Sequence, residues 1–346
     1  MKRHIVYLFF FIGMSTVCIA QTKILCRVND SGKYGFIDKT GAFVIEPQFD
    51  FAWSFSEGLA PVQKDSLFGY IDYNGNLIID YQYEDALWFY EGLAAVQKRG
   101  KWGYINLRGD SITDFVFDDT FDFSEGLAVV SVCGYCGYIN RKGEFSIPLK
   151  YKNCYRFVDG TAVVSDSIHK KYMLINKNGE IIDTNTNIDP IRMNDNLKLI
   201  AYWDSDKGRA GLKKRNGKII LHPIYQSVGI FTEGRSIVKI DGKYSIVNKH
   251  GQLLFPPIYD DMFHFYEGLA GVKLNDKWGF INKNGKLVIP IAFDLVGHFE
   301  NGLAPILINE KVGYINRKGK IQIQPIFDET EGGRWDYFQK VEKYIP

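Results

Sequence analysis

The chain of 346 residues is long enough for two ordinary domains or for one extended repeat array. Its 42 basic and 40 acidic residues nearly balance, which excludes the strongly basic surface that nucleic-acid binding or attachment to anionic lipid needs. Aromatic residues are abundant, with 21 Tyr, 25 Phe and 6 Trp, and glycine is frequent at 34 residues. This balance favours strands and tight turns over helices.

The first twenty residues have the pattern of an export signal. Lys2 and Arg3 form a basic start, and the apolar stretch that follows is too short to span a bilayer. Cys18 and Ala20 supply the small residues that a signal peptidase recognises. We therefore expect a signal peptide over residues 1–20, cleaved after Ala20, and an exported protein in the periplasm, on the outer surface or secreted. An uncleaved anchor helix and lipidation at Cys18 are the alternatives.

Export would leave a neutral chain. Removal of Lys2 and Arg3 leaves 40 basic and 40 acidic residues, and no later segment is long and apolar enough to cross a membrane. We expect neither a nucleic-acid partner nor a membrane span after cleavage.

The remaining sequence repeats itself nine times with a period of about 34 residues. The stretch "KWGYINLRG" at 101–109 returns as "KWGFINKNG" at 277–285. Its first glycine recurs in one column, at Gly35, Gly69, Gly103, Gly137, Gly211, Gly279 and Gly313. Met173 and Ser245 occupy this column in the fifth and seventh copies. A second glycine column and an "EGL"-like block keep the same register, which chance does not explain.

Each copy predicts a three-stranded antiparallel meander followed by a loop. The alternation in "LAPVQK" from Leu59 predicts the first strand, "WGYIN" the second, and "KLVIP" at 286–290 the third. Asn106 and Gly109 predict a type I turn closed by a glycine at positive φ. The segment "FDFAWSFSEG" at 49–58 then leads into the next copy.

The glycine inside the second strand needs a reason, because glycine weakens a strand unless something approaches its backbone closely. We expect an aromatic ring from the same or the next copy to lie over Gly103 and its equivalents. A β-bulge is the alternative.

An isolated meander is only marginally stable, so the copies must stack on one another. The expected fold is all-β, an array of about nine three-stranded antiparallel β-meander repeats of about 34 residues. An open superhelical stack is favoured over a closed β-propeller, because nine blades exceed the usual four to eight.

The repeats divide the chain into four parts. Residues 1–20 form the signal peptide, 21–170 hold repeats one to four, 171–206 hold a degenerate fifth repeat, and 207–346 hold repeats six to nine. The fifth repeat has Met173 at the glycine position and lacks the "EGL" block. Fewer stacked rings there predict a seam in the array.

Several stretches together resemble a known family. "KWGYINLRG", "KWGFINKNGKLVIP", "PPIYDDMFHFYEGLAGV" and "PQFDFAWSFSEGLAPV" are similar to the WG-repeat (KWG-repeat) proteins of bacteria, over roughly residues 24–346. The resemblance implies an exported or surface-associated repeat protein without assigned catalysis. The chain departs from the pattern at Met173 and at Ala210, which stands where an aromatic residue is usual.

The motif "CGYC" holds Cys133 and Cys136 near a predicted hairpin turn, with no helix following. In an exported protein a disulfide between Cys133 and Cys136 is favoured over two free thiols, and a redox or metal role comes last. Zinc would need two further ligands, and only Cys154 and His169 are near in sequence. Cys26 and Cys154 share columns with small residues and are predicted to be buried fillers.

One acidic column could suggest calcium, at Asp50, Glu84, Asp118, Asp260, Asp294 and Asp328. One carboxylate per copy does not cluster the six or more oxygens that calcium prefers, so we expect these side chains to cap turns. The histidines occupy unrelated positions, and no nucleophile accompanies them. We therefore predict no catalytic residues, no metal, no cofactor and no enzymatic activity. A site assembled at the irregular central repeats is the alternative.

One loop column suggests a binding surface. Trp53, Phe121, Tyr155 and Phe263 are equivalent, and Trp88 is one residue away from the same place. Aromatic loops on a repeat array suit sugar rings or peptides, although they could also plug the gaps between copies. We expect a non-enzymatic binding or interaction scaffold at the bacterial envelope or surface, with a protein or glycan ligand. A purely structural spacer is the remaining alternative.

Overall fold

The computed structural model describes residues 23–165, 172–184, 199–204, 208–214, 218–328 and 339–341. The predicted signal peptide and the centre of the predicted seam, residues 185–198, lie outside these described residues. Every regular element within them is a β-strand, and the strands pair antiparallel. The predicted all-β repeat class is confirmed.

The repeated unit is a small sheet whose strands follow chain order. In copy two, the two-residue strand β4 (Phe51–Ala52) pairs with β5 (Leu59–Lys64), which pairs with β6 (Leu67–Asp72) and then β7 (Leu77–Tyr83). The copies are numbered here by the strand glycine column, so that copy one contains Gly35.

The other copies contain the following strands. Copies three to five hold β8 (Asp85–Ala86), β9 (Leu93–Lys98), β10 (Lys101–Asn106), β11 (Asp119–Thr120), β12 (Leu127–Val132), β13 (Tyr135–Asn140), β14 (Phe145–Tyr151), β15 (Asn153–Cys154), β16 (Thr161–Ser165), β17 (Tyr172–Asn176) and β18 (Ile181–Asp183). Copies six to nine hold β19 (Leu199–Asp204), β20 (Arg209–Lys214), β21 (Ile219–Tyr225), β22 (Ser227–Thr232), β23 (Arg235–Ile240), β24 (Lys243–Asn248), β25 (Asp261–Met262), β26 (Leu269–Leu274), β27 (Lys277–Asn282), β28 (Leu287–Phe293), β29 (Leu295–Val296), β30 (Leu303–Ile308), β31 (Lys311–Asn316) and β32 (Ile321–Asp328). Copy one holds β1 (Lys23–Asp30), β2 (Lys33–Asp38) and β3 (Phe43–Phe49), and β33 (Gln339–Val341) joins it.

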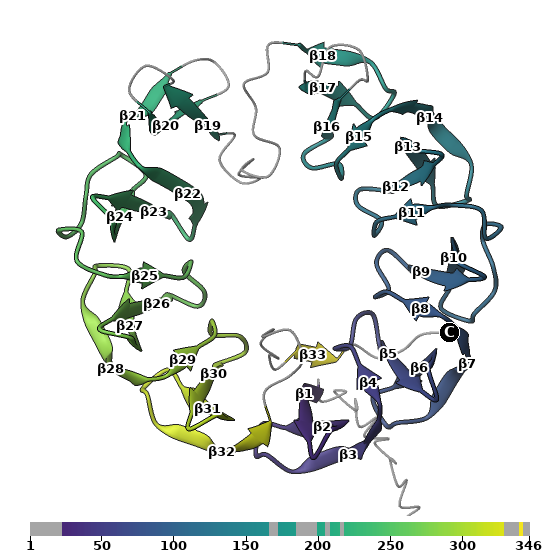
Figure 1. Ribbon diagram of the computed structural model, residues 1–346, viewed down its shortest axis with the longest axis horizontal. Coiled ribbons are helices and arrows are strands. Elements are labelled where there is room, and N and C mark those ends of the chain that lie inside the picture. Colours follow the sequence, from purple (N-terminus) through teal and green to yellow (C-terminus); the bar gives the residue numbers. More distant parts are fainter. Residues whose placement is uncertain are drawn as a thin grey trace, which may run out of the picture.

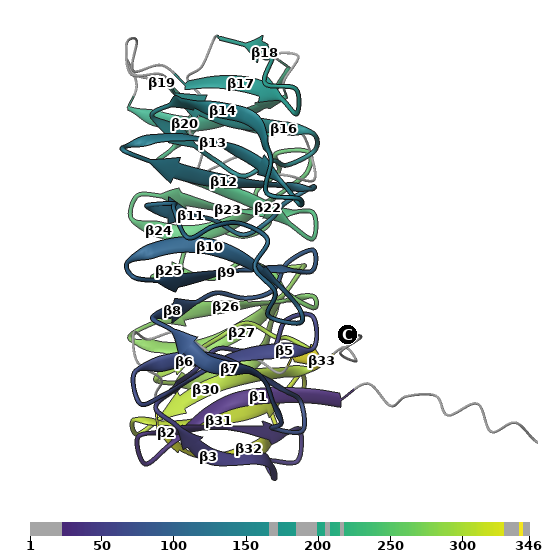
Figure 2. The same ribbon diagram turned by 90° about the vertical axis from the view of Figure 1, so that its right-hand side faces the viewer.

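The sheets follow one another around a ring, and the ends of the array meet (Figure 1). β1 pairs with β33 and also meets β32 at Asn29 opposite Asp328, so the first and last copies share one sheet. Seen edge-on, the copies stay in one layer (Figure 2). The array of three-stranded repeats is confirmed, and within the described residues copies two to eight each form a separate sheet. The preference for an open superhelical stack is corrected in one respect, because the first and last copies are hydrogen-bonded to each other.

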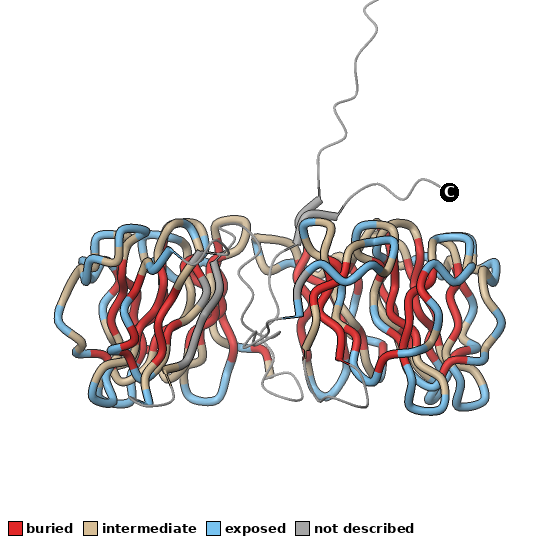
Figure 3. Tube along the Cα trace, turned by 90° about the horizontal axis from the view of Figure 1, so that it is seen from above, coloured by how far each residue is buried: buried red, intermediate tan, exposed pale blue. Residues whose placement is uncertain are grey.

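The core lies between neighbouring sheets, and the turns at both faces of the ring are exposed (Figure 3). One aromatic pair recurs, formed by a ring of the second strand and a ring of the following loop. Its centroids are 4.8 to 5.0 Å apart in Phe36–Phe55, Tyr70–Phe89, Tyr104–Phe123, Tyr138–Phe157 and Phe280–Phe299. Each buried ring contributes up to about 4–6 kcal/mol, so these pairs contribute strongly to the stability of the core.

The strand glycines are required by a β-bulge. A Cβ on Gly35 would lie 2.7 Å from the carbonyl oxygen of Ile45, where the register of β2 and β3 shifts. The backbone of the third strand makes the same approach at Gly69, Gly137, Gly279 and Gly313. The expectation of an aromatic ring is therefore wrong for these positions. At Gly103 a ring does approach, because Phe115 would lie 3.0 Å from the added Cβ.

The predicted turns and turn caps are confirmed. Gly109 has φ +85° and donates its backbone N–H to the carbonyl of Asn106 at 2.9 Å. In the acidic column, Asp118 accepts a hydrogen bond from the backbone N–H of Cys133 at 2.6 Å and pairs with Lys101. The Lys101 ammonium and the Cys133 N–H hold the pKa of the Asp118 carboxyl below its usual value. Asp118 thus fixes the turn at Cys133, which borders the candidate site.

Candidate functional site

A cleft of about 320 Å³ lies between copies four and five, at the junction of the sheet β11–β14 and the sheet β15–β18. Phe121 and Tyr155, two of the five predicted ligand-binding aromatics, line it. Phe121 follows the two-residue strand β11, and Tyr155 follows the equivalent strand β15. The repeated loop position therefore contributes one ring from each of the two copies.

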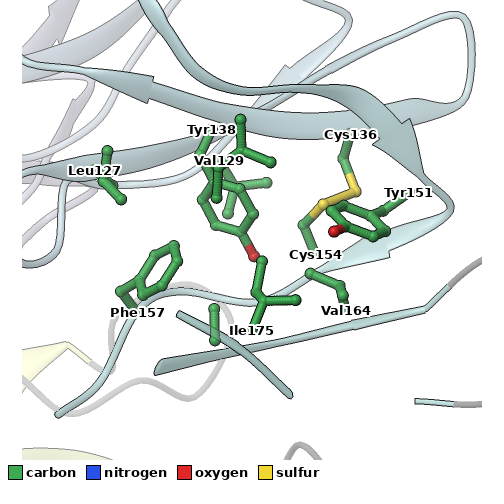
Figure 4. Packing of buried hydrophobic residues seen from close by; sticks show 11 residues of the cluster. Leu127, Val129, Cys136, Tyr138, Tyr151, Cys154, Phe157, Val164 and Ile175 are labelled. Carbon is green, nitrogen blue, oxygen red and sulfur yellow. A yellow bond between two sulfur atoms is a disulfide. The ribbon is translucent and has the colours of Figure 1, made fainter. Parts of the chain in front are cut away.

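A disulfide between neighbouring copies forms part of the cleft wall. Cys136 of β13 is bonded to Cys154 of β15, with the two Cα atoms 6.0 Å apart (Figure 4). The predicted pairing of Cys133 with Cys136 is wrong, and Cys154 is not a simple filler. Cys133 lies exposed in the turn at φ +51°, whereas Cys136 points into the core and is only 5% exposed. Cys26 is buried, as expected.

The sequence does contain a signal for this disulfide. Cys136 occupies the aromatic column beside the strand glycine, and Cys154 occupies the small-residue column 18 positions later. The same two columns hold Trp278 in copy eight and Val296 in copy nine, and both belong to one buried cluster. Residues of these two columns therefore meet across the junction, and two cysteines placed there can bond.

Two of the aromatic residues that line the cleft are exposed to solvent. The side chain of Phe121 is 55% exposed and that of Tyr135 is 42% exposed. Tyr155 is partly buried, and its ring centroid lies 6.3 Å from that of Tyr172. These rings offer flat apolar surfaces on which another ring could stack.

The polar side chains of the cleft are mostly engaged within the protein. Lys152 Nζ donates to the carbonyl of Gly134 at 3.0 Å and lies 4.6 Å from the centroid of the Tyr135 ring. Asn153 Nδ2 donates to Ser165 Oγ at 2.7 Å. Asp119, which also lines the cleft, accepts from the backbone N–H of Thr120 through Oδ1 at 2.9 Å.

The structure does not bring the other predicted ligand-binding aromatics to this cleft. The rings of Trp53 and Trp88 pack on each other with centroids 4.6 Å apart. The buried guanidinium of Arg27 lies 5.8 Å from the Trp53 ring. Phe263 stacks on Trp278 with centroids 4.4 Å apart. Packing between copies, the alternative given above, describes Trp53 and Trp88, whereas Phe263 packs on a tryptophan of its own copy.

The loops on the inner side of the ring carry titratable groups with shifted pKa values (Figure 1). Burial raises the pKa of Asp122 to about 6, against the opposing charge of Arg156, and Asp122 Oδ1 is buried without a hydrogen-bond partner. Burial lowers the pKa of His298 to about 4, and its ring stacks on Tyr266 at 4.0 Å. Sequence analysis did not single out these residues, because burial of a loop position is not visible in the repeat pattern.

The described residues contain neither a metal-binding cluster nor a membrane-spanning helix. No group of three or more His, Cys, Asp or Glu side chains among them could hold a metal ion. The same part of the chain has no helix that is long and apolar enough to span a membrane.

Comparison with solved structures reveals similar folds. A crystal structure of the eukaryotic initiation factor matches with a TM-score of 0.54 and 10% identity, over 87% of this chain and 95% of that chain. Dihydro-heme d1 dehydrogenase NirN in complex with DHE matches with a TM-score of 0.48 and 11% identity, over 89% of this chain and 73% of that chain. At such identities the first likeness shows the fold alone.

Comparison with protein families identifies the repeats. No protein of curated function matches the sequence. Eight segments match the family described as WG containing repeat, at residues 34–67, 68–102, 102–135, 137–166, 211–244, 245–278, 278–311 and 313–332. These segments together cover most of the chain, which therefore belongs to the WG-containing-repeat family.

Proposed function

We propose that this protein is an exported, non-enzymatic binding scaffold at the bacterial envelope or surface, with a protein or glycan ligand. One observation carries the proposal. The hairpin of the first two meander strands recurs in every described copy, whereas the loop column after the acidic residue varies between Trp53, Phe121, Tyr155 and Phe263. A rigid frame with variable loop residues is typical of binding proteins.

The supporting features concern the surface and the chain start. The neutral charge balance gives no basis for nucleic-acid binding. Export rests on the basic and apolar pattern of residues 1–20. An enzymatic site in the irregular fifth repeat would fall largely on residues 185–198, outside the described part of the chain.

A pull-down tests the scaffold role. The mature chain, residues 21–346, is immobilised and incubated with an envelope fraction, and a glycan array is probed in parallel. We expect one specific partner, with capture reduced at least tenfold by Trp53→Ala combined with Trp88→Ala if the loop column as a whole binds. Leu77→Ala is the control, because Leu77 is an exposed apolar residue on β7, away from the loop column.

The remaining outcomes separate the alternatives. Capture that survives the double tryptophan substitution but is lost with Phe121→Ala assigns binding to the cleft alone. Empty results from both the pull-down and the array would reject the scaffold and favour a structural spacer. Turnover of a captured small molecule would favour an enzyme.

A further inference from the structure

The cleft corresponds to a place that a tryptophan covers elsewhere in the ring. In copy eight, Trp278 stands in the column of Cys136, and Phe263 stands in the column of Phe121. The Trp278 and Phe263 rings stack with centroids 4.4 Å apart and planes 15° apart. Trp278 is buried in this arrangement.

Copy four keeps the phenylalanine but lacks the indole. Cys136 is too short to cover a ring, and its sulfur is bonded to that of Cys154. Phe121 is consequently left 55% exposed at the edge of the cleft. The platform on which a tryptophan stacks in copy eight is thus present in copy four without its partner ring.

We propose that this cleft binds a tryptophan side chain presented by a partner polypeptide. The proposal rests on the scaffold role proposed above and names the ligand chemistry for one site. The indole of the partner would stack on Phe121, as Trp278 stacks on Phe263. The partner would thus supply a ring that copy eight supplies from its own chain. Tyr135 and Tyr155 would border its edges.

The polar lining favours an indole over a sugar. A sugar ring needs several hydrogen-bonding groups for its hydroxyls, because buried polar groups left without partners cost free energy. Lys152 and Asn153 each use one N–H within the protein, and the Ser131 hydroxyl donates to the Asp119 carbonyl at 3.4 Å, so part of this polar lining is already engaged. An indole needs one acceptor for its N–H, and the exposed carboxylate of Asp119, which uses Oδ1 for the Thr120 N–H, can provide it.

The test uses the purified protein and a small probe, N-acetyl-5-fluorotryptophanamide, observed by ¹⁹F NMR. A single side chain should bind with a Kd on the order of 1 mM. Phe121→Ala should weaken binding about tenfold, because it removes the stacking surface. N-acetyl-leucinamide and an N-acetylglucosamine oligomer serve as competitors, and only unlabelled N-acetyl-tryptophanamide should displace the probe.

Copies eight and nine supply the design of a variant that fills the cleft. Val129→Gly, Cys136→Trp and Cys154→Val together reproduce Gly271 and Trp278 of copy eight and Val296 of copy nine. This triple variant should cover Phe121 with its own indole and abolish binding. Leu77→Ala is the control, because Leu77 is an exposed apolar residue on β7 that does not line the cleft, and it should bind the probe as wild type does. If the triple variant does not fold, the Phe121→Ala result decides the question.

Specific results would overturn the proposal. Probe binding that is unchanged in both Phe121→Ala and the triple variant would place the ligand elsewhere, and so would no binding at 10 mM probe. Displacement by the sugar oligomer alone would make the cleft a glycan site. A partner captured from the envelope that is indifferent to Phe121→Ala would reject this cleft and leave the scaffold role intact. Failure to capture any partner would reject the scaffold role itself.

Discussion

The glutamate of the "EGL" block shows how one residue joins two copies. Glu91 has φ +54° and Gly92 has φ +81°, which is the conformation of a two-residue hairpin turn with positive φ at both positions. A non-glycine residue in this region costs free energy. The Glu91 carboxylate offsets that cost by accepting the backbone N–H of Gly126, in the same turn of the next copy, at 2.9 Å. Glu57 and Gly92 make the preceding link at 2.7 Å.

Asp122 is the residue at which pH should matter most directly. Burial raises its folded-state pKa to about 6, above the ordinary 3.8. Between these values the folded chain holds the proton more tightly than the unfolded chain, so this group lowers stability as pH rises from about 4 to 6. Asp122→Asn should therefore raise the free energy of unfolding at pH 7.5 by about 1–2 kcal/mol, a figure reduced for partial exposure.

Urea unfolding at pH 4.5 and 7.5 measures this effect. Asp118→Asn is the control with the opposite sign, since the Lys101 and Cys133 contacts lower the pKa of Asp118 and its contribution is lost as pH falls. An Asp122→Asn variant with the same stability difference between the two pH values as wild type would contradict the prediction.

At the scale of the element, the strands and turns could be predicted from the sequence, whereas the strand glycines could not be fully explained. Alternating apolar residues and the Asn–Gly spacing carry local information, and they correctly located β9, β10 and the turn at Gly109. The backbone of β7 approaches Gly69 because the register of β6 and β7 shifts at this position. Because that shift depends on how two strands meet, the glycine column alone does not reveal it.

A comparison of two glycines tests this account of the bulge. A Cβ on Gly69 would lie 2.6 Å from the carbonyl oxygen of Ile79, and backbone cannot easily move away. At Gly103 the approach is looser, because the nearest atoms are the Phe115 ring at 3.0 Å, which can rotate, and the Asp114 carbonyl oxygen at 3.1 Å. Gly69→Ala should cost about 2–3 kcal/mol and Gly103→Ala no more than about 1 kcal/mol. Equal losses in chemical denaturation would show that the bulge does not determine this column.

The candidate site was only partly predictable at the same scale. The loop column correctly pointed to Phe121 and Tyr155 as lining residues, but it also included Trp53 and Phe263, which pack against other rings. The difference lies in the residue of a second column, where Trp278 covers Phe263 and Cys136 leaves Phe121 exposed. Reading one column at a time cannot reveal a contact between two columns.

At the scale of the whole molecule, ring closure follows from an interface that repeats the contact between consecutive copies. A Cβ on Gly41 of copy one would lie 3.3 Å from Ile323 of copy nine, as one on Gly75 would lie 3.5 Å from Ile45. Asp328, the acidic-column residue of copy nine, accepts a hydrogen bond from the backbone N–H of Ser31 in copy one at 3.1 Å. It therefore caps a turn of the first copy in the way that Asp118 caps the turn at Cys133. The sequence did not predict closure, because curvature accumulates from small rotations at every interface.

Within the described residues, buried clusters join every pair of neighbouring copies except copies five and six. The cluster around Ile175 joins copies four and five, and the Cys136–Cys154 disulfide reinforces that junction. The cluster around Val238 joins copies six and seven. A cluster that includes Cys26 and Tyr314 joins copies one and nine. The seam predicted over residues 171–206 stays a prediction, because residues 185–198 within it lie outside the described part of the chain.

Limited proteolysis should cut this seam first, between about Asn185 and Gly208, because residues 171–206 lack the strand glycine and the "EGL" block. A denaturing gel should show two stable fragments near 21–180 and 210–346. Native gel filtration should still show one species, since the fragments remain joined through copies nine and one. Ile323→Asp, which places a charge in that buried junction, should let the fragments separate. An early cut in a regular loop such as 118–125 would argue against the seam, and fragments that separate without this substitution would argue against the closed ring.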